Sequence, residues 1–193
     1  MTQKPFVPAL LIVDMQNDFV NPATRLYSPR AREIIPAINE LARAARAQRA
    51  PVIWIVQEHR RQVVDFGREA DISPVHCVEG TPGAALIDGL NRADDDFTVI
   101  KRRFSGFYAT DLDLLLRCLS CNTLFLTGIA SDGCVEATAI DAHARDYFVR
   151  VVSDATAGVS ETAHEAALAA MSRLQPGVVI GAAVATKQLA GAT

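Results

Sequence analysis

The sequence contains no hydrophobic run long enough to cross a membrane and no excess of basic residues. A transmembrane helix needs about 18 or more consecutive apolar residues, and every apolar stretch of this chain is shorter. Lysine and arginine number 19 against 22 acidic residues, for a formal net charge of −3. This balance lacks the basic surface that nucleic-acid binding requires. We therefore expect a protein that acts on neither a membrane nor a nucleic acid.

Cysteine is also scarce, with four residues in 193, and the N-terminal stretch lacks the apolar core of a secretory signal. We therefore expect no disulfide-stabilised secreted scaffold, and in the cytoplasm the thiols stay reduced. The length suits one domain with a complete hydrophobic core. A composition that is 50% hydrophobic and 21% charged is ordinary for a globular protein. The expectation is a single cytoplasmic domain over residues 1–193.

Strand-like apolar runs alternate along the chain with amphipathic helical patterns. The expected strands are 9–13, 52–56, 97–100, 123–127, 148–152 and 178–180, and the expected helices are 31–48, 111–119, 135–146 and 161–173. Loop-forming residues fill 58–81, a short helix or turn is expected at 84–90, and a Gly/Ala/Thr tail follows the last strand. Unbroken apolar strands that alternate with helices predict an α/β fold whose parallel sheet is covered on both faces.

Cys134 stands where a strand turns into a helix. The apolar run 123–127 breaks at Gly128, turns through residues 131–133 and enters a helical pattern from Val135 onward. The helix dipole and the unpaired N–H groups of the first turn favour an anion, which makes a thiolate accessible near neutral pH. A cysteine is more often a small buried hydrophobe, but this position favours a nucleophile.

Asp14 and Lys101 also follow or end predicted strands. Open parallel sheets bind their ligands at the carboxyl ends of the strands, so both side chains are expected near Cys134. A carboxylate can accept the thiol proton, and an ammonium group can balance the negative charge. Taken singly, the Asp suits a helix cap or a solvated loop, and the Lys suits a solvated basic loop.

Three segments together resemble a known superfamily. They are LLIVDMQNDF (10–19), IKRRFSGFYATDL (100–112) and GIASDGCVEATA (128–139). These motifs are similar to those of the isochorismatase-like cysteine hydrolases, which include nicotinamidases, N-carbamoylsarcosine amidases and hydrolases of biuret and other ureides. The resemblance runs from about residue 8 to residue 183, with the motifs in the family's order and at similar spacing.

The resemblance implies a three-layer α/β/α Rossmann-like sandwich with a mainly parallel sheet of about six strands. It also implies a catalytic triad in which Asp14 is the base, Lys101 the cation and Cys134 the nucleophile. The family has a non-proline cis peptide bond that falls here on Ile129–Ala130. This bond would direct the N–H of Ala130, together with that of Cys134, at the oxyanion of the reaction.

The chain departs from the nicotinamidase pattern after the second strand. Nicotinamidases usually carry an Asp and two His there as metal ligands, whereas QEHRR at 57–61 contains one His. We therefore expect no metal and no cofactor, and a substrate other than nicotinamide. His59 is expected to hydrogen-bond at the pocket rim. Arg61 is expected either to contact a carbonyl or carboxylate of the substrate or to lie in a solvated loop.

Three further residues are candidates for the substrate pocket. Phe19 and Phe107 flank triad residues and are expected either to form an apolar wall or to belong to the core. Gln175, which precedes a Pro-Gly pair, is a candidate hydrogen-bond partner for a ureide. The loops 58–80 and 102–108 are expected to supply the remaining contacts.

The predicted function is a cysteine amidohydrolase that cleaves a C–N bond of a small amide or ureide, of the biuret, triuret or N-carbamoyl type, through a thioester. The family further implies a homodimer or homotetramer. Three alternatives remain open. They are a nicotinamidase-like amidase, a Cys–His hydrolase with His59 as base, and a non-catalytic thiol sensor or binding protein on the same fold.

Overall fold

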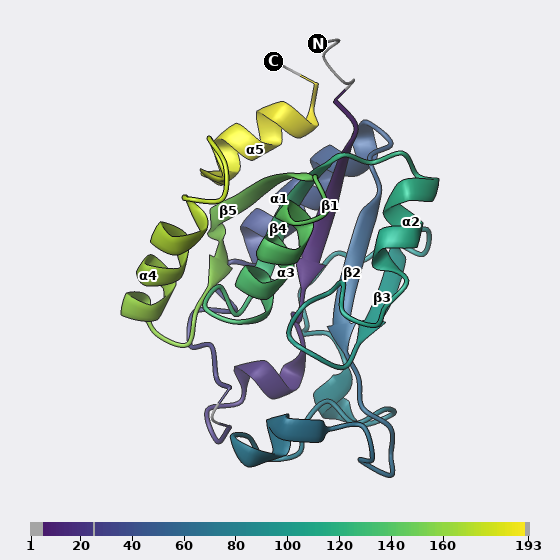
Figure 1. Ribbon diagram of the computed structural model, residues 1–193, viewed down its shortest axis with the longest axis vertical. Helices are drawn as coiled ribbons and strands as arrows, with labels where there is room; N and C mark the ends of the chain where they lie inside the picture. Colours follow the sequence, from purple (N-terminus) through teal and green to yellow (C-terminus); the bar gives the residue numbers. More distant parts are fainter. Residues whose placement is uncertain (1–5, 25, 192–193) are drawn as a thin grey trace.

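The computed structural model describes residues 6–24 and 26–191 (Figure 1). Within these ranges, six strands form one sheet in the order β3-β2-β1-β4-β5-β6, and every neighbouring pair is parallel. The strands are β1 (Pro8–Val13), β2 (Val52–Gln57), β3 (Phe97–Lys101), β4 (Thr123–Ile129), β5 (Phe148–Ala157) and β6 (Val179–Ile180).

Helices cover both faces of this sheet (Figure 1). They are α1 (Ile35–Ala47), α2 (Leu112–Cys118), α3 (Cys134–His143), α4 (Glu161–Met171) and α5 (Ala182–Leu189), with short 3-10 turns at Asn17–Val20, Gly67–Asp71 and Pro82–Ala84. Helices α1 and α5 pack on one face, and α2, α3 and α4 pack on the other. The expected three-layer α/β/α sandwich is confirmed. No helix within the described ranges is long and apolar enough to span a bilayer.

The central strand β1 shows why the strands read as unbroken apolar runs. Leu10 and Ile12 point into the core beneath α1 and α5, whereas Leu11 and Val13 point into the core beneath α2, α3 and α4. Successive side chains of a strand face opposite sides of the sheet, so a strand covered on both faces must be apolar at every position. Each large apolar side chain buried in this way contributes about 1.5–3 kcal/mol.

One predicted helix start and the predicted C-terminal tail need correction. The helix expected from residue 31 begins at Ile35, because residues 29–34 form turns and Pro36 occupies the first turn of α1, where the missing N–H of proline costs nothing. The expected C-terminal tail is wrong for residues 182–189, which form α5. Alanine, common in this segment, has the highest helix propensity, and the buried Ala185 and Leu189 pack one turn apart against the core.

Strand β5 is longer than expected, because it continues past Val152 to Ala157. Its middle contains the polar residues Ser153 and Asp154, which ended the predicted strand. The pairing with β4 is irregular between Leu126 and Gly128. Beyond the irregularity β5 pairs with β4 again, at Thr156 with Gly128 and at Ala157 with Ile129. The end of β5 therefore lies next to the turn that follows β4.

Gly128 allows β4 to approach β1 closely. It pairs with Val13, its φ is +99°, and a Cβ atom there would lie 2.1 Å from the carbonyl oxygen of Val13. A side chain at this position therefore meets a backbone atom that cannot move without breaking the sheet. The glycine fixes the end of β4 just before the turn that leads to Cys134.

We expect Gly128→Ala to destabilise the fold by at least about 3 kcal/mol, because it combines the left-handed backbone with a backbone clash. Gly177→Ala is the matched control, because Gly177 also has a positive φ (+71°) but has no atom within 4 Å of the added Cβ. The control should lose only about 1–2 kcal/mol. Urea denaturation followed by circular dichroism measures both values, and equal losses would contradict the role of the close approach.

Candidate active site

Three side chains at the carboxyl edge of the sheet form a buried group, which we call the Asp–Lys–Cys triad. Nζ of Lys101 lies 2.7 Å from Oδ2 of Asp14 and 3.4 Å from Sγ of Cys134. The exposed fractions are 0% for Lys101, 1% for Asp14 and 8% for Cys134. The residue Cys134 therefore keeps some contact with the exterior, while its two partners have almost none.

The local backbone places each member of the triad. Asp14 follows β1 in the left-handed region, with φ at +50°, and its N–H donates to the carbonyl of Ile55 on β2. Lys101 is the last residue of β3, and Cys134 is the first residue of α3. Since all strands are parallel, their carboxyl ends share one edge of the sheet, and Cys134 stands at the positive end of the α3 dipole.

Burial governs the ionisation of the triad. It raises the pKa of the Cys134 thiol, and the Asp14 carboxylate raises that pKa further against the opposing effect of Lys101. Burial also raises the pKa of Asp14, although Lys101 and Cys134 act to lower it. For Lys101, burial acts to lower the pKa, but the charges of Asp14 and Cys134 outweigh it, so that the pKa is raised.

These shifts correct one expectation from the sequence. The helix dipole alone does not make the thiolate of Cys134 accessible near neutral pH, because burial and the neighbouring carboxylate oppose its ionisation. The charged Lys101 instead supports one anion in the triad, either the Asp14 carboxylate or the Cys134 thiolate. The two groups therefore share one proton and titrate as a coupled pair.

The turn before Cys134 presents two backbone donors. The peptide bond Ile129–Ala130 is cis, as expected. The carbonyl of Ala130 accepts the N–H groups of Gly133 and Val135 at 3.0 and 3.1 Å, which places it at the start of α3. Within residues 6–24 and 26–191, the N–H groups of Ala130 and Cys134 donate to no protein acceptor. Paired free donors of this kind can stabilise an oxyanion.

The loop between β5 and α4 holds this turn from behind. The N–H of Ser131 donates to the carbonyl of Ala157 at 2.9 Å, and Oγ of Ser131 lies 2.9 Å from Nδ1 of His164. Oδ1 of Asp132 accepts the N–H of Val159 at 3.1 Å. The two free donors therefore belong to a fixed turn rather than to a mobile loop.

A second buried polar cluster lies directly behind Lys101. Gln57, the last residue of β2, accepts a hydrogen bond from Nζ of Lys101 at 3.0 Å through Oε1. Its Nε2 lies 3.0 Å from Nε2 of His59 and from both carboxylate oxygens of Glu69, and 3.2 Å from Nε2 of His76. We call Gln57, His59, Glu69 and His76 the glutamine cluster.

Residues 57–61 contain one histidine, but the fold brings a second one to it. The loop after β2 folds back, so that His76 and Glu69 meet His59, with ligand atoms within 4.8 Å of one another. His59 is also fully buried rather than at a pocket rim. Its ring nitrogens contact Gln57 and Asp65, and the described contacts of the Cys134 sulfur do not include it.

The two histidines of the cluster differ in charge. Burial lowers the pKa of His59 despite the nearby carboxylates of Glu69 and Asp65, so this ring is neutral. Burial acts to lower the pKa of His76 as well, but contact with Glu69 outweighs it and the pKa is raised. Burial acts to raise the pKa of Glu69, which is nevertheless lowered by His76 and Gln57. Both shifts favour the charged forms of His76 and Glu69, whose Nε2 and Oε1 lie 3.3 Å apart.

The chemistry of these donors, but not the space between them, fits a metal ion. Two imidazoles and a carboxylate are a common zinc donor set, with metal–ligand distances of about 2.0–2.2 Å. The NH₂ group of Gln57, however, lies 3.0–3.2 Å from all three ligand groups. An ion in contact with them would meet this group, which offers protons and no lone pair. The cluster as arranged does not fit a metal ion.

The remaining sequence candidates divide between the site and the core. Phe19 is buried with its ring centroid 5.4 Å from that of His76, so it covers the glutamine cluster. Arg61 lies exposed in its loop, with its N–H directed at Glu79. Phe107 is a core residue packed 5.9 Å from Tyr147.

Gln175 does not belong to the candidate site. Its side chain accepts the N–H of Val149 and donates to the carbonyl of Tyr147, at the beginning of β5. The beginning of a parallel strand lies at the edge of the sheet opposite the triad, which corrects the expectation that Gln175 contacts a ureide.

Sequence reasoning missed Gln57, Glu69 and His76. A signal existed for Gln57, because it ends an apolar strand just as Lys101 does. Glu69 and His76 lie in the loop-rich segment after β2, where no periodic pattern marks which residues turn inward.

A cavity of about 560 Å³ lies between α3 and the loops after β2 and β3; no triad side chain lines it, but residues next to the triad do. Glu69 of the glutamine cluster lines it, as does Ala137, one helical turn after Cys134. Its other lining residues come from α3 and from the two loops expected to contact substrate: Arg68, Ile72, Arg103, Phe104, Ser105, Tyr108 and Asp141. This cavity is therefore the candidate substrate pocket.

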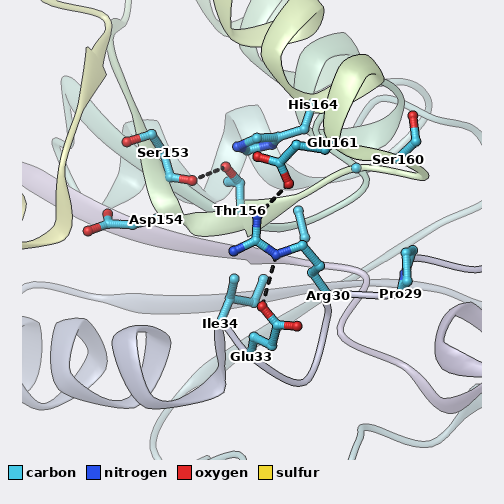
Figure 2. Close-up of a pocket in the computed structure, with 12 residues that line it drawn as sticks. Pro29, Arg30, Glu33, Ile34, Ser153, Asp154, Thr156, Ser160, Glu161 and His164 are labelled. Atoms are coloured by element: carbon cyan, nitrogen blue, oxygen red, sulfur yellow. Dashed lines mark hydrogen bonds and ion pairs between the residues drawn. The ribbon is translucent and has the colours of Figure 1, made fainter.

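A smaller cleft of about 200 Å³ lies where the end of β5 meets α4. Figure 2 shows Arg30 in this cleft between Glu33 and Glu161, with ion-pair distances of 2.9 and 2.5 Å. Arg30 is thus paired with two carboxylates, and Asp154 accepts the N–H of Ala182 at 2.6 Å, so within the described residues the cleft offers no unpaired cation for a ligand.

Replacing Asp14 by Asn removes the carboxylate that raises the pKa of Cys134 and leaves Lys101 beside the sulfur. The thiol should then ionise at lower pH. Alkylation of Cys134 by iodoacetamide at pH 7 should be about tenfold faster, because one pKa unit changes the thiolate fraction about tenfold. Mass spectrometry of the Cys134 peptide across a pH series measures the effect.

The opposite control is Lys101→Met, which removes the cation and should slow the alkylation. Slower alkylation of Asp14→Asn would contradict the charge balance described above, because it would mean that the carboxylate promotes ionisation of the resting thiol.

Comparison with known proteins places this geometry in a family. Residues 8–185 match the Isochorismatase domain. A ureidoacrylate amidohydrolase of Methylobacterium radiotolerans is 34% identical over 190 residues, covering 86% of this chain and 73% of that protein. An Arabidopsis thaliana protein named as a probable inactive nicotinamidase is 34% identical over 177 residues, covering 86% and 88%. A solved pyrazinamidase of Pyrococcus horikoshii in complex with zinc has a TM-score of 0.81 at 31% identity, covering 91% and 99%.

The resemblance carried by the three sequence motifs is thereby confirmed, since the match spans nearly the whole sheet and its helices. The chain belongs to the isochorismatase family, and within it to the amidohydrolases, which cleave carbon–nitrogen bonds other than peptide bonds.

Proposed function

We propose that this chain is a cysteine amidohydrolase that cleaves a C–N bond of a small ureide, of the biuret, triuret or N-carbamoyl type, and releases ammonia or an amine. Cys134 is the nucleophile, Asp14 transfers protons, and Lys101 balances the charge. The observation that carries the proposal is the position of the Lys101 ammonium, in contact with both the Asp14 carboxylate and the Cys134 sulfur.

The first half-reaction forms a thioester. The Cys134 thiol gives its proton to Asp14 as the sulfur attacks the substrate carbonyl carbon, and the carbonyl π electrons move to the oxygen. The N–H groups of Ala130 and Cys134 stabilise this oxyanion. As the oxyanion collapses, the C–N bond breaks and Asp14 returns its proton to the leaving nitrogen. Ammonia or an amine departs, and the acyl group remains on sulfur.

The second half-reaction consumes water. Asp14 takes a proton from a water molecule, whose oxygen attacks the thioester carbonyl through the same oxyanion. When the C–S bond breaks, the sulfur leaves as a thiolate beside Lys101 and takes the proton back from Asp14. The acid product departs, and the triad regains its starting charge. Lys101 stays protonated throughout, since Asp14 and Cys134 raise its pKa.

The charges of the candidate pocket support a substrate with an anionic group. Asp141 pairs with Arg145, and Arg68 pairs with Asp71. Arg103 is half-buried and donates to the carbonyl oxygens of Asp65 and Arg102, and among the described residues it has no carboxylate partner within ion-pair distance. Its charge therefore remains for a ligand, which favours an N-carbamoyl acid.

A nicotinamide-type aromatic amide is the second candidate. The names of related proteins favour it as much as a ureide, and the exposed rings of Phe104 and Tyr108 at the pocket offer a surface for an aromatic ring. A neutral ring amide makes no use of Arg103, however, so the two substrate classes predict different effects of mutating this residue.

The direct test is ammonia release from a panel of N-carbamoyl amino acids, biuret, triuret and nicotinamide. Wild-type protein should turn over at least one ureide, and Cys134→Ala should lose all measurable activity while circular dichroism shows an unchanged fold. Cys118→Ala, which removes an exposed cysteine, should leave the rate unchanged. Turnover by Cys134→Ala would contradict the mechanism, and cleavage of nicotinamide alone would favour the second candidate.

The role of Arg103 is tested by Arg103→Met, which keeps the length of the side chain and removes its charge. KM for an N-carbamoyl amino acid should rise about tenfold or more, the usual loss for a charged hydrogen bond, while kcat stays similar. KM for the neutral biuret should not change. Arg68→Met, which removes an exposed arginine paired with Asp71, is the matched control and should have little effect on either substrate.

A further inference from the structure

The side-chain amide of Gln57 joins the Asp–Lys–Cys triad to the glutamine cluster. Its two ends face different partners: Oε1 faces the ammonium of Lys101, and Nε2 faces His59 and Glu69. Gln57 is fully buried, so water cannot replace either set of contacts. The amide therefore has to satisfy both ends within the protein.

Hydrogen-bond accounting fixes the orientation of the amide. An ammonium group only donates, so the end of Gln57 that faces Lys101 must be the oxygen. The NH₂ group then supplies two protons, which suit the unprotonated Nε2 of His59 and the carboxylate of Glu69. A flipped amide would place NH₂ protons against the protons of Lys101, and both groups would lose their partners.

His76 completes the cluster without a metal. Its Nδ1 lies 2.9 Å from the carbonyl oxygen of Pro74, and its Nε2 lies 3.3 Å from Oε1 of Glu69. Nε2 also lies 3.2 Å from the NH₂ group of Gln57, but the two protons of that group go to His59 and Glu69, so Nε2 of His76 donates to Glu69 and Nδ1 donates to Pro74. The positive charge that balances Glu69 thus belongs to His76.

We propose that the amide of Gln57 takes the place of a metal ion between His59, Glu69 and His76, and that it is a positioning residue for Lys101. The NH₂ group fills the space where these three side chains converge. The amide oxygen is the third acceptor of the ammonium, beside Asp14 and Cys134. Three donors with three acceptors hold the ammonium in one orientation against the sulfur.

This inference builds on the proposed function where it concerns Lys101, but its first part concerns metal binding and does not depend on activity. Removing the amide should open the space between two imidazoles and a carboxylate, which zinc readily binds. The side chain of Gln57 on β2 thus determines whether its own amide or a zinc ion lies between His59, Glu69 and His76.

Zinc binding tests the first part. Wild-type protein and Gln57→Ala are titrated with zinc chloride by isothermal calorimetry, and the zinc content after dialysis is measured by atomic absorption. Gln57→Ala should bind one zinc ion per chain at least about a hundredfold more tightly than wild type. Gln57→Ala combined with His76→Asn should lose this site, which separates it from zinc held by thiols.

Two results would overturn the proposal. One is a zinc ion on the wild-type protein that His76→Asn removes, because the amide would then not exclude the metal. The other is a folded Gln57→Ala that binds no more zinc than wild type. If Gln57→Ala fails to fold, the comparison of wild type with His76→Asn still decides the first result.

Alkylation of Cys134 tests the positioning of Lys101. In Gln57→Met, with EDTA present, the ammonium loses its third acceptor and holds the thiolate less well. The midpoint pH of iodoacetamide alkylation should rise by about one unit. Thr127→Val is the control, because Thr127 is equally buried and its hydroxyl donates to the carbonyl of Leu11, not to the triad or to Gln57. Equal midpoints in wild type and Gln57→Met would overturn the positioning role.

Discussion

The arrangement of the site depends on the buried ion pair between Lys101 and Asp14. An ammonium group removed from water needs an anion and an acceptor for each proton, or it gives up its charge. Asp14 supplies the anion at 2.7 Å, and Gln57 and Cys134 accept the other two protons. Asp14 follows β1, Gln57 ends β2 and Cys134 begins α3. The ammonium of Lys101 therefore has all three partners only when these elements and β3 are correctly aligned.

The strand ends also explain which parts of the site the sequence could predict. Asp14 and Lys101 each interrupt an apolar run at the carboxyl end of a strand, and Cys134 begins the helix that follows β4. In a parallel sheet these ends share one edge. Gln57 stands in the same position on β2, and the same rule would have identified it. The core strands were equally predictable, because a strand buried on both faces is apolar at every position.

The loop after β2 and the C-terminal helix were not predictable from the same patterns. His76 and Glu69 are separated from His59 by loop residues with no period, so their convergence follows from tertiary folding and not from local spacing. Helix α5 is short, and its alanines give a weak contrast between its buried and exposed faces. In both cases the deciding information is which surface the segment packs against, which the segment does not itself contain.

The glutamine cluster bears on how strongly the triad can hold an anion. His76 and Glu69 neutralise each other, and the amide of Gln57 is uncharged, so the cluster adds no net charge behind Lys101. Lys101 is then the positive side-chain group in contact with Asp14 and Cys134, and it supports one negative charge shared between them. A divalent ion between the same side chains would add positive charge next to the ammonium. The anion of the triad would then be shared between two cations and would depend less on Lys101. With the uncharged amide of Gln57 behind Lys101, the triad contains one cation and one proton shared between Asp14 and Cys134. Acid–base transfer between the carboxylate and the thiol requires that shared proton.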